Sequence, residues 1–502
     1  MMPAVGATLA AESLGPLGVL LSVVADGLGG PAWLVGGAVR DALLGRPVED
    51  LDLALPAGSL EAARRLADRL GAAFVPLGEP HGVARVVVRG PAGTRPILID
   101  LADFRGPTLD ADLAGRDVTV NALAVPLDRL LRGPAPVIDP TGGLADLAAG
   151  RLRACSRTAF AADPVRVLRL LREAETLGFV IDPTTEREAR AAVPRLDTVA
   201  AERVRDEVTR LLRLPAGAAA WRRAEAWSVV GTILSETVAM RGATQSLPHR
   251  FTVWEHSLAA LEAVEALLLD LGFLVPHDAR IAAHLAEPLG SGLTRRKVLK
   301  MAVLLHDVAK PETRSVDPDG RIRFTGHDRI GAGRVARVAA RLRWPGHAAH
   351  VLERLVRQHL RPMHLGMLES ISRRARYRFF RDVGDEVLDL VCLTIADAAG
   401  TDGRPPAAVY RGPARDLLAS LLAGQVEAAR EAAAPPLLRG TDVMAAFGLP
   451  PGPEIGRLLR AAREAQATGE VRTREEALAW LRHHPDPPGR ERAERDERDP
   501  SG

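Results

Sequence analysis

The stretch from Leu34 to Leu55, LVGGAVRDALLGRPVEDLDLAL, decides the fold of the first part of the chain. Apolar runs at both ends enclose a glycine pair, a short segment with helical spacing and a Gly-Arg-Pro break. This order predicts strand, glycine turn, helix, turn and strand. Gly36 and Gly37 would let backbone N–H groups approach a polyphosphate, and the N-terminus of the next helix favours an anion at the same place. Arg40 would reach a phosphate there.

Two acidic residues follow on the second predicted strand. Asp50 and Asp52 are two positions apart, so their side chains should leave one face of the strand and hold one or two Mg²⁺ ions. Metals held there activate a hydroxyl and neutralise a leaving pyrophosphate, as nucleotidyl transfer requires. Such a pair alone is more often a solvated surface turn. The glycine pair and Arg40 upstream favour the catalytic interpretation.

The segment GGAVRDALLGRPVEDLDLA resembles, without a gap, the signature of the class II tRNA nucleotidyltransferases and bacterial poly(A) polymerases, in the polymerase β-like superfamily. The resemblance implies an α+β fold. A small polymerase β-like head, a mixed sheet with helices, would precede a mostly α-helical neck, an HD domain and a tail. The expected ranges are 1–155 for the head, 156–240 for the neck, 241–425 for the HD domain, 426–484 for the tail and 485–502 for a disordered end.

The composition is that of a soluble, reducing-compartment protein. The 502 residues suffice for roughly three or four domains, and a net charge of +3 excludes a generic polycation, so RNA contacts must come from local clusters. Cys155 and Cys392 lack CxxC spacing, which indicates the cytoplasm. The first basic residue is Arg40 and no apolar run of about 18 residues is evident, so we expect neither a signal peptide nor a membrane span.

The remainder of the predicted head supplies further candidates. A leading helix within residues 1–33 should pack on the head, and strands are expected at Ala72–Pro76, Val83–Arg89 and Ile97–Leu101. Asp100 in the last strand is a third candidate metal ligand, or a capping aspartate. Downstream, residues 109–124 resemble a stretch that ends in RRDFTINA in the family, which implies that Arg116 and Asp117 contact ribose and phosphates. This chain departs from that pattern at Gly115 and Val118.

A row of arginines follows in ADPVRVLRLLREAETLGF. Arg166, Arg169 and Arg172 recur every three residues between apolar neighbours, which favours guanidinium groups held over a cleft rather than an exposed stripe. Without a template, an enzyme that selects C and A must read the bases itself, and both present an amino donor beside a ring-nitrogen acceptor. A carboxylate next to an arginine fits that pair. Asp163 and Arg166 are so spaced, in a segment similar to the family's EDxxR element with Ala162 in place of glutamate.

A second constellation of ligands begins at His256. His306 and Asp307 are adjacent at the end of an apolar helix, and Asp397 follows on another helix. Their order, with Lys310 completing HDxxK, resembles the HD phosphohydrolase superfamily. The resemblance implies Mn²⁺, Fe²⁺, Ni²⁺ or Mg²⁺ holding a water for attack on a phosphoester. His327 and His359 are candidates for a second metal site, for phosphate binding or for a plain structural role.

The tail from Arg439 to Leu481 resembles the family's C-terminal element. It reads as a helix, a Pro-Gly turn and a basic helix with Arg457, Arg460 and Arg463. The expected ligand is a tRNA backbone, and the alternative is a dimer or packing surface.

Together these features predict a template-independent enzyme that adds C and A to the tRNA 3′ end from CTP and ATP with Mg²⁺, with a second phosphohydrolase activity in the HD domain. The catalytic aspartates would be Asp50 and Asp52. The set expected to hold triphosphate, ribose and base is Gly36, Gly37, Arg40, Arg116, Asp117, Asp163, Arg166, Arg169 and Arg172. The oligomeric state stays open.

Three alternatives remain at this point. A poly(A) polymerase would share the head, but Leu77 to Gly90 lacks the arginine-rich stretch associated with that branch. A CC-adding enzyme is closer, because the segment between Arg105 and Leu109 is very short where full CCA enzymes carry a flexible loop. The third is an HD phosphohydrolase whose inactive head only binds RNA.

Overall fold

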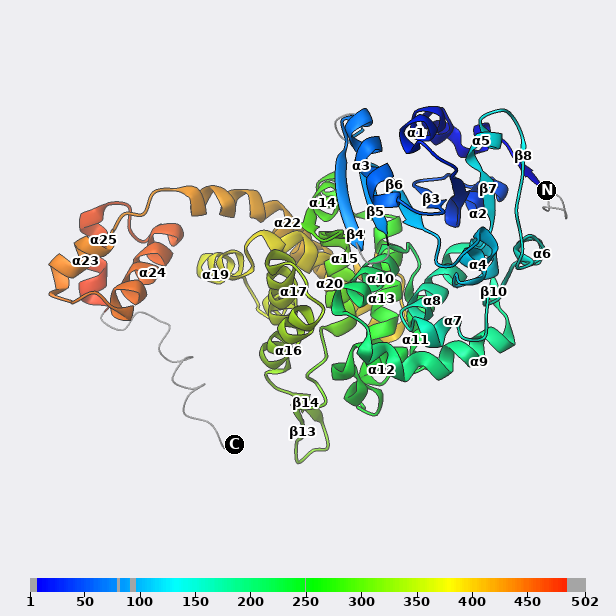
Figure 1. The fold of residues 1–502 in the computed structure, drawn as a ribbon. Coiled ribbons are helices and arrows are strands. Elements are labelled where there is room, and N and C mark those ends of the chain that lie inside the picture. The colour runs from blue at the N-terminus through cyan, green and yellow to red at the C-terminus, as the bar shows by residue number, and fades with distance from the viewer. Residues whose placement is uncertain (1–6, 79–81, 91–95, 249, 485–502) are drawn as a thin grey trace. The chain divides into compact units, whose positions relative to one another are not determined.

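The computed structural model describes residues 7–78, 82–90, 96–248 and 250–484 (Figure 1). The predicted disorder of 485–502 lies outside the described residues. The chain divides into two compact units, Met1–Ser235 and Glu236–Gly502, which are described separately. The finer boundaries at 155 and 425 stay predictions.

The first unit contains a six-stranded mixed sheet in the order β4-β5-β6-β3-β2-β7. Strands β3 and β6 are parallel, and the other neighbours are antiparallel. The strands are β2 (Trp33–Val35), β3 (Leu51–Leu55), β4 (Ala73–Gly78), β5 (Val83–Val88), β6 (Ile97–Asp103) and β7 (Ala124–Pro126). The predicted mixed sheet is confirmed, and three of its strands match the predicted segments closely.

The segment from Leu34 to Leu55 folds as strand, turn, helix and strand. Gly36 joins β2 to α2 (Gly37–Leu43) with a φ of 74°, a conformation that favours glycine. The prediction that Asp50 lies within the strand is wrong, because β3 begins at Leu51 and Asp50 occupies the bend before it. Only Asp52 belongs to the strand.

The leading segment packs on the head through α3 (Ser59–Leu70). It consists of η1 (Ala11–Leu20) and α1 (Leu21–Leu28), with a break in helical geometry at Gly15. Ala11–Leu28 is 18 residues long and apolar enough to cross a membrane by length and composition, so the statement that no such run exists is wrong. Leu14, Leu21 and Val24 are buried, and 33% of this window is buried inside the protein.

Small elements connect the sheet to the helices that follow: β1 (Thr8–Leu9), α4 (Leu109–Ala114), η3 (Thr119–Asn121), α5 (Leu127–Leu130), β8 (Ala135–Pro136), α6 (Gly143–Ala148) and β9 (Arg151–Leu152). The rest of the first unit is helical: α7 (Ala159–Ala162), α8 (Arg166–Leu177), α9 (Pro183–Ala192), η4 (Val193–Thr198), α10 (Ala201–Arg213), α11 (Ala218–Ala226) and α12 (Val229–Ile233), with β10 (Val180–Ile181) paired to β9. Helix α8 contacts α9, α10 and α11, so the arginine-bearing helix sits inside this bundle.

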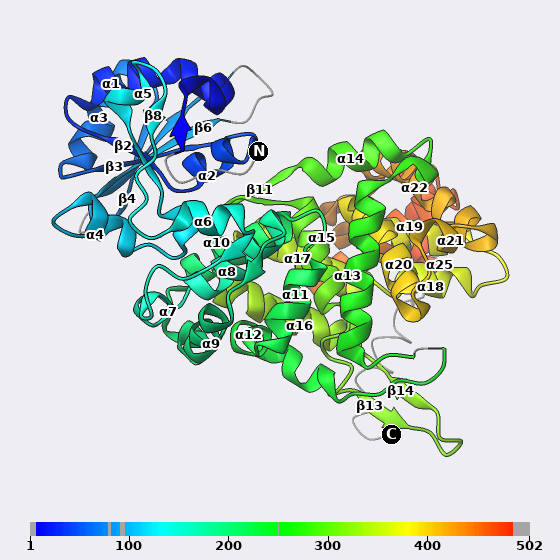
Figure 2. The same cartoon turned by 90° about the vertical axis from the view of Figure 1, so that its right-hand side faces the viewer.

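The second unit is built around four long helices that contact one another (Figure 2). They are α13 (Val253–Leu269), α15 (Arg295–Leu305), α17 (Gly346–Gln358) and α20 (Val387–Asp402). A side-chain capping box of Thr252 and Glu255 starts α13. Gly400 allows α20 to approach α13 closely, since a Cβ there would lie 2.6 Å from the backbone nitrogen of Ala260.

Two further long helices belong to that unit, α16 (His327–Arg341) and α22 (Gly412–Ala433). Its shorter elements are η5 (Ser235–Arg241), η6 (Gly272–Leu274), α14 (Asp278–Ala286), β11 (Pro288–Gly290), β12 (Leu293–Thr294), β13 (Arg314–Val316), β14 (Ile322–Phe324), α18 (Arg361–Gly366), α19 (Arg373–Val383), η7 (Gly384–Glu386) and α21 (Pro406–Val409). The tail helices α23 (Gly440–Phe447), α24 (Pro453–Thr468) and α25 (Arg474–His483) enclose a small apolar core of their own. The predicted order of helix, Pro-Gly turn and basic helix is confirmed.

Candidate active sites

The head gathers three carboxylates at one edge of its sheet. Asp52 in β3 lies directly opposite Asp100 in the parallel strand β6, and Asp50 precedes β3. Burial, together with the negative charges of Asp100 and Asp50, raises the pKa of Asp52 to about 6. Carboxylates crowded in this way repel one another, and a bound divalent cation relieves the repulsion. The chemistry of this donor set therefore fits Mg²⁺.

Asp100 has a partner that the sequence did not reveal. Its two oxygens accept hydrogen bonds from Nε and Nη2 of Arg85, each at 2.7 Å. Asp100 is thus next to Asp52, as a third ligand must be, but its charge is shared with an arginine.

Gly36 contributes space rather than a hydrogen-bond donor. A Cβ at this position would lie 3.4 Å from Oδ2 of Asp52 and 3.2 Å from Nη1 of Arg116. Its N–H donates to the carbonyl of Leu123 at 3.2 Å, so this N–H is not directed at a phosphate. The glycine thus leaves room for the side chains of Arg116 and Asp52 on the same side of the turn.

Arg40 lies beside the glycine turn, since a Cβ on Gly37 would be 3.5 Å from its Nη2. It is 6% exposed, and its guanidinium donates to Glu173 at 2.9 Å, to Asp41 and to Asn121. Because Glu173 belongs to α8, Arg40 ties α2 to the helical bundle. The structure therefore gives Arg40 a positioning contact, and its contact with a phosphate stays a prediction.

Arg116 and Asp117 sit beside the acidic cluster. Arg116 donates to Asp112 at 2.9 Å and approaches Gly36. Asp117 is buried and accepts from Arg169 at 3.0 Å and from the N–H of Val118. Burial alone would raise the pKa of Asp117. The positive charge of Arg169 and the hydrogen bond from Val118 instead hold this pKa well below its usual range. This carboxylate therefore stays ionised.

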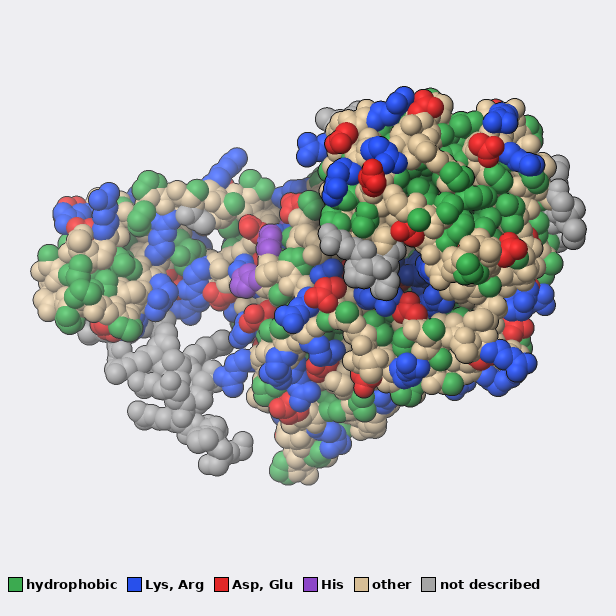
Figure 3. Space-filling model, in the orientation of Figure 1, with side chains coloured by type: hydrophobic (Ala, Val, Ile, Leu, Met, Phe, Trp, Pro, Cys, Tyr) green, Lys and Arg blue, Asp and Glu red, His purple; other side chains and the backbone are tan. Residues whose placement is uncertain are grey.

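The arginine row on α8 is held by a glutamate on α10. Glu207 is 2% exposed and pairs with Arg169 at 3.4 Å, with Arg172 at 3.1 Å and with Arg210 at 2.6 Å. No chemistry was predicted for this helix, and a buried glutamate beside a basic row was the signal that could have indicated it. Basic side chains line a recess of the first unit in Figure 3.

Asp163 and Arg166 are brought together as the spacing predicted. Their charged atoms lie 3.5 Å apart, and Arg166 also donates to the carbonyls of Gly115 and Arg116. Oδ2 of Asp163 accepts from Arg203 at 2.7 Å. Oδ1 accepts no hydrogen bond from any described residue. The pair thus keeps one acceptor that is buried and has no hydrogen-bond partner among the described residues.

The second unit brings all six predicted ligands together. One group consists of His256, His306 and Asp397, and the other of Asp307, His327 and His359, and in each group the ligand atoms lie within 4.8 Å of one another. Asp307 connects the groups, because Oδ2 is 3.2 Å from Nε2 of His306 while Oδ1 is 3.3 Å from Nε2 of His327. The geometry is that of two adjacent cation sites bridged by one carboxylate.

Backbone carbonyls fix the tautomers of three of these histidines. Nδ1 of His306, His327 and His359 lies 2.8, 2.6 and 2.7 Å from the carbonyls of Val303, Phe324 and Val356. A carbonyl only accepts, so each Nδ1 carries the hydrogen and each neutral ring turns the lone pair of Nε2 inward. Nε2 of His327 faces that of His359 at 3.2 Å, which suits a cation between them. The residues therefore fit metal ions.

The electrostatics of this cluster differ from one histidine to the next. Although burial alone would lower the pKa of His306, the charges of Asp307 and Asp397 raise it to about 10, so this ring must lose its extra proton when a cation binds. Burial and the neighbouring His306 and His327 lower the pKa of His359 to about 4, so its ring is neutral at pH 7. Lys310 places Nζ 2.6 Å from Oδ2 of Asp307 and donates to Gln245 at 2.7 Å. The predicted HDxxK lysine thus contacts the bridging carboxylate.

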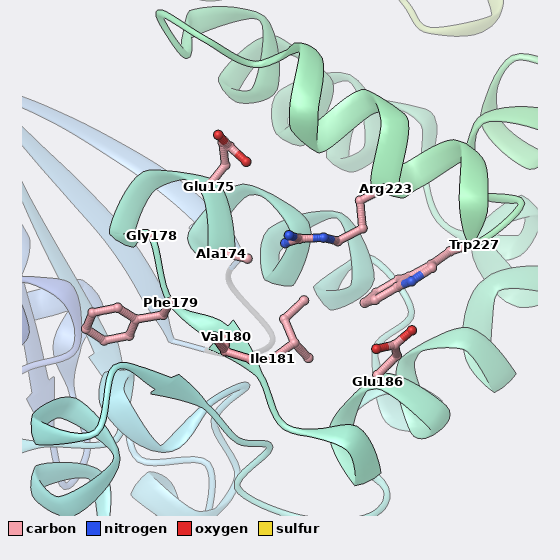
Figure 4. A pocket seen from close by; sticks show the side chains of 9 residues that line it. All are labelled: Ala174, Glu175, Gly178, Phe179, Val180, Ile181, Glu186, Arg223 and Trp227. Atoms are coloured by element: carbon pink, nitrogen blue, oxygen red, sulfur yellow. The ribbon is translucent and has the colours of Figure 1, made fainter.

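A separate pocket of about 390 Å³ lies among the helices of the first unit (Figure 4). It is lined by Ala174, Glu175, Gly178, Phe179, Val180, Ile181, Glu186, Arg223 and Trp227. None of the predicted nucleotide-binding residues belongs to this lining. Arg166, Arg169 and Arg172 do not line this pocket either.

The fold and these two sites define a class: a nucleotidyltransferase head with a helical bundle, joined to an HD domain. Residues 32–153 match the family model of the Poly A polymerase head domain, and residues 253–400 match that of the HD domain. Residues 178–239 match the model of the probable RNA and SrmB-binding site of polymerase A.

Known proteins narrow the class further. The chain is 37% identical to the A-adding tRNA nucleotidyltransferase of Deinococcus radiodurans over 90% of its length and 94% of that protein. It is 34% identical to the CC-adding tRNA nucleotidyltransferase of Geobacter sulfurreducens, covering 93% and 95% of the two chains. The chain belongs to the tRNA nucleotidyltransferase family.

Solved structures share the fold at low identity. A CCA-adding enzyme in complex with ATP superimposes with a TM-score of 0.60 and 20% identity, covering 95% of this chain and 97% of that one. The Thermotoga maritima CCA-adding enzyme with tRNA gives 0.52 and 20%, covering 93% and 94%. The predicted head, helical region and HD domain are thus confirmed as a fold.

Glu207→Gln tests whether α10 positions the arginine row of α8. Removing the charge leaves Arg169 and Arg172 without their shared carboxylate, and loss of one member of a buried ionic group costs about 3–5 kcal/mol. We expect a lower midpoint in urea unfolding and a higher KM for nucleotides. Glu202→Gln on the same helix is the matched control, and equal behaviour of the two variants would contradict this role.

Proposed function

We propose that the protein is a template-independent tRNA nucleotidyltransferase that adds C and A to the tRNA 3′ end from CTP and ATP and releases pyrophosphate. The observation that carries this proposal is the juxtaposition of Asp52 and Asp100, with Asp50 beside them, next to Arg116 across Gly36. Membership of the tRNA nucleotidyltransferase family and relatives of both A-adding and CC-adding type support it.

The roles of the head residues follow from their contacts. Asp50 and Asp52, with Asp100 as a further ligand, would hold Mg²⁺, which activates the 3′ hydroxyl and neutralises the leaving pyrophosphate when bound. Arg116, Asp117, Arg169 and Arg172 would orient the triphosphate and ribose, and Gly37, at the start of α2, would let the backbone lie close to them. Arg40 keeps this frame in place through Glu173.

Base selection would fall to Asp163 and Arg166. Oδ1 of Asp163 is buried without a hydrogen-bond partner among the described residues, and it would accept from the exocyclic amino group that cytosine and adenine share once a base displaces the side chains that cover it. Arg166 would donate to the adjacent ring nitrogen. Uracil and guanine present a carbonyl at that place, which leaves the carboxylate unpaired.

The tail and the compartment complete this proposal. Arg457, Arg460 and Arg463 of α24 would contact the tRNA backbone, as part of a tail that spans residues 426–484. Two cysteines without CxxC spacing agree with a cytoplasmic enzyme.

The test uses purified full-length protein with Mg²⁺ and tRNA lacking its 3′ CCA. We expect labelling from CTP, and then from ATP once CC is present. Labelling from CTP alone would reduce the activity to CC addition. The short connection between β6 and α4 favours that alternative, because its five residues leave no room for a flexible loop. Labelling from neither nucleotide would overturn the proposal.

We also propose a metal-dependent phosphohydrolase in the HD domain. The bridging position of Asp307 between two histidine-containing groups supports it. Imidazole with carboxylate ligands suits a transition metal such as Mn²⁺, Fe²⁺ or Ni²⁺, and Mg²⁺ is the alternative. A 2′,3′-cyclic nucleotide is the probe substrate, and the absence of turnover with each of these metals would reduce the domain to a scaffold.

A further inference from the structure

Arg105 occupies a fixed position at the edge of the head site, between β6 and α4. The N–H of Phe104 donates to Leu55 at 2.8 Å, and the N–H of Arg105 donates to Oδ1 of Asp112 at 3.2 Å. The ring of Phe104 lies 5.4 Å from that of Trp33. The backbone on both sides of this arginine is therefore anchored to the sheet and to α4.

The side chain of Arg105, in contrast, has no partner. It is exposed, and no hydrogen bond or ion pair joins its guanidinium to any of the residues that the structure describes. The other arginines of the site are engaged: Arg40 with Glu173, Arg116 with Asp112, Arg166 with Asp163, and Arg169 and Arg172 with Glu207. Arg105 is thus available to an incoming anion.

Positive charge is in excess around this group. Partial desolvation and the charges of Arg116 and Arg166 lower the pKa of Arg105. The carboxylate of Asp112 is the nearest compensation, but it already accepts from Arg116 and from a backbone N–H. An anion placed among these guanidinium groups would relieve their repulsion.

The side chain of Arg105 passes next to Gly115, at the distance of an ordinary van der Waals contact. An ideal Cβ on Gly115 would be 3.9 Å from Cδ of Arg105, so the stem of Arg105 runs past the point where a side chain at 115 would begin. Gly115 is also the position where the sequence departs from the adjacent arginines of the motif it resembles.

We infer that Arg105 binds a phosphate oxyanion of the substrates and takes the place of an arginine at position 115. This inference rests on the proposed nucleotidyl transfer. The planar guanidinium can donate two parallel hydrogen bonds to one phosphate group. That phosphate belongs either to the triphosphate of the nucleotide or to the backbone of the RNA 3′ end.

Steady-state kinetics of Arg105→Ala distinguish these sources. Loss of a charge-assisted hydrogen bond raises KM about 10- to 100-fold. A rise in the KM for CTP at saturating tRNA assigns Arg105 to the triphosphate, and a rise in the KM for tRNA at saturating CTP assigns it to the RNA backbone. Arg129→Ala, an exposed arginine on α5, is the matched control. If Arg105→Ala leaves both constants unchanged, the inference is overturned.

A second variant tests the exchange of positions. Gly115 has a φ of −80°, which any residue adopts, and a Cβ there would lie 3.4 Å from the carbonyl oxygens of Ala111 and Asp112. Adding Gly115→Arg to Arg105→Ala should lower the raised KM again by at least about fivefold. If Arg105 had a purely structural role, the second substitution would leave the KM raised. Failure of the rescue overturns the exchange.

Failure of this inference can be distinguished from failure of the proposed nucleotidyl transfer. A wild-type protein that incorporates neither CTP nor ATP contradicts nucleotidyl transfer. Calorimetric titration of CTP into the wild type and Arg105→Ala then still tests the inference, since equal dissociation constants contradict binding of the triphosphate and a weaker one supports it.

Discussion

Asp52→Asn should reduce nucleotide addition to tRNA by at least about a thousandfold, because the loss of one metal-binding carboxylate removes several kilocalories of transition-state stabilisation. The effect should appear in kcat, measured by incorporation of labelled CTP. Hydrolysis by the HD domain should be unchanged. Asp68→Asn, an exposed aspartate on α3, is the matched control.

The same variant should be more stable than the wild type when Mg²⁺ is absent. In the folded protein the pKa of Asp52 is raised from 3.8 to about 6, so folding favours the protonated form. The stability that this side chain contributes is present below pH 4 and is lost as the pH rises through 6. At pH 8 the asparagine removes a charge that costs on the order of 2 kcal/mol, a value that allows for partial solvent access.

Thermal unfolding in the presence of a metal chelator tests whether Asp52→Asn is more stable than the wild type. We expect a higher Tm for Asp52→Asn at pH 8 and nearly equal values at pH 4, with the advantage reduced when excess Mg²⁺ binds the wild type. A variant less stable than the wild type at pH 8 without metal would show that the carboxylates do not repel one another, and the proposed Mg²⁺ site would lose its main support.

Asp307→Ala should remove both metal ions from the HD domain and abolish its hydrolysis of 2′,3′-cyclic nucleotides. Its two oxygens face the two histidine groups, so the substitution deprives both sites of a ligand at once. Metal analysis of the protein after dialysis against Mn²⁺ measures the first effect, and phosphate release measures the second. Nucleotide addition should persist.

His359→Ala provides the graded comparison, because His359 belongs to only one group. We expect it to halve the bound metal, whereas Asp385→Ala, an exposed residue, should leave it unchanged. Equal metal content in Asp307→Ala and the wild type would rule out the bridged arrangement.

Local sequence signals predicted most of the fold. The glycine pair, the Gly-Arg-Pro break and the alternation of apolar runs gave the order of strands and helices around β2, α2 and β3, since these features act within a few residues. The HD ligands were predicted by their chemical type and order along apolar helices. The start of β3 was placed one residue too early, because the strand boundary depends on pairing with β6.

Partners of charged groups could not be predicted in the same way. Arg40 points to Glu173, which lies 133 positions away along the chain, and Glu207 joins two arginines from another helix. Such contacts depend on how α8 and α10 pack, which no short spacing records. The position of Arg105 beside Arg116 and Arg166 could not be predicted for the same reason, since Arg166 belongs to α8.

The three histidines whose Nδ1 atoms meet a carbonyl three residues earlier have a consequence for heating experiments. Each ring takes its orientation from its own local backbone, so the distances between Nε2 atoms vary only when the segments carrying the rings shift against one another. Release of a bound ion on heating would therefore show that the helices have shifted against one another before they unfold. With Co²⁺, a coloured ion, the loss of its absorbance would report this loosening of the helix packing.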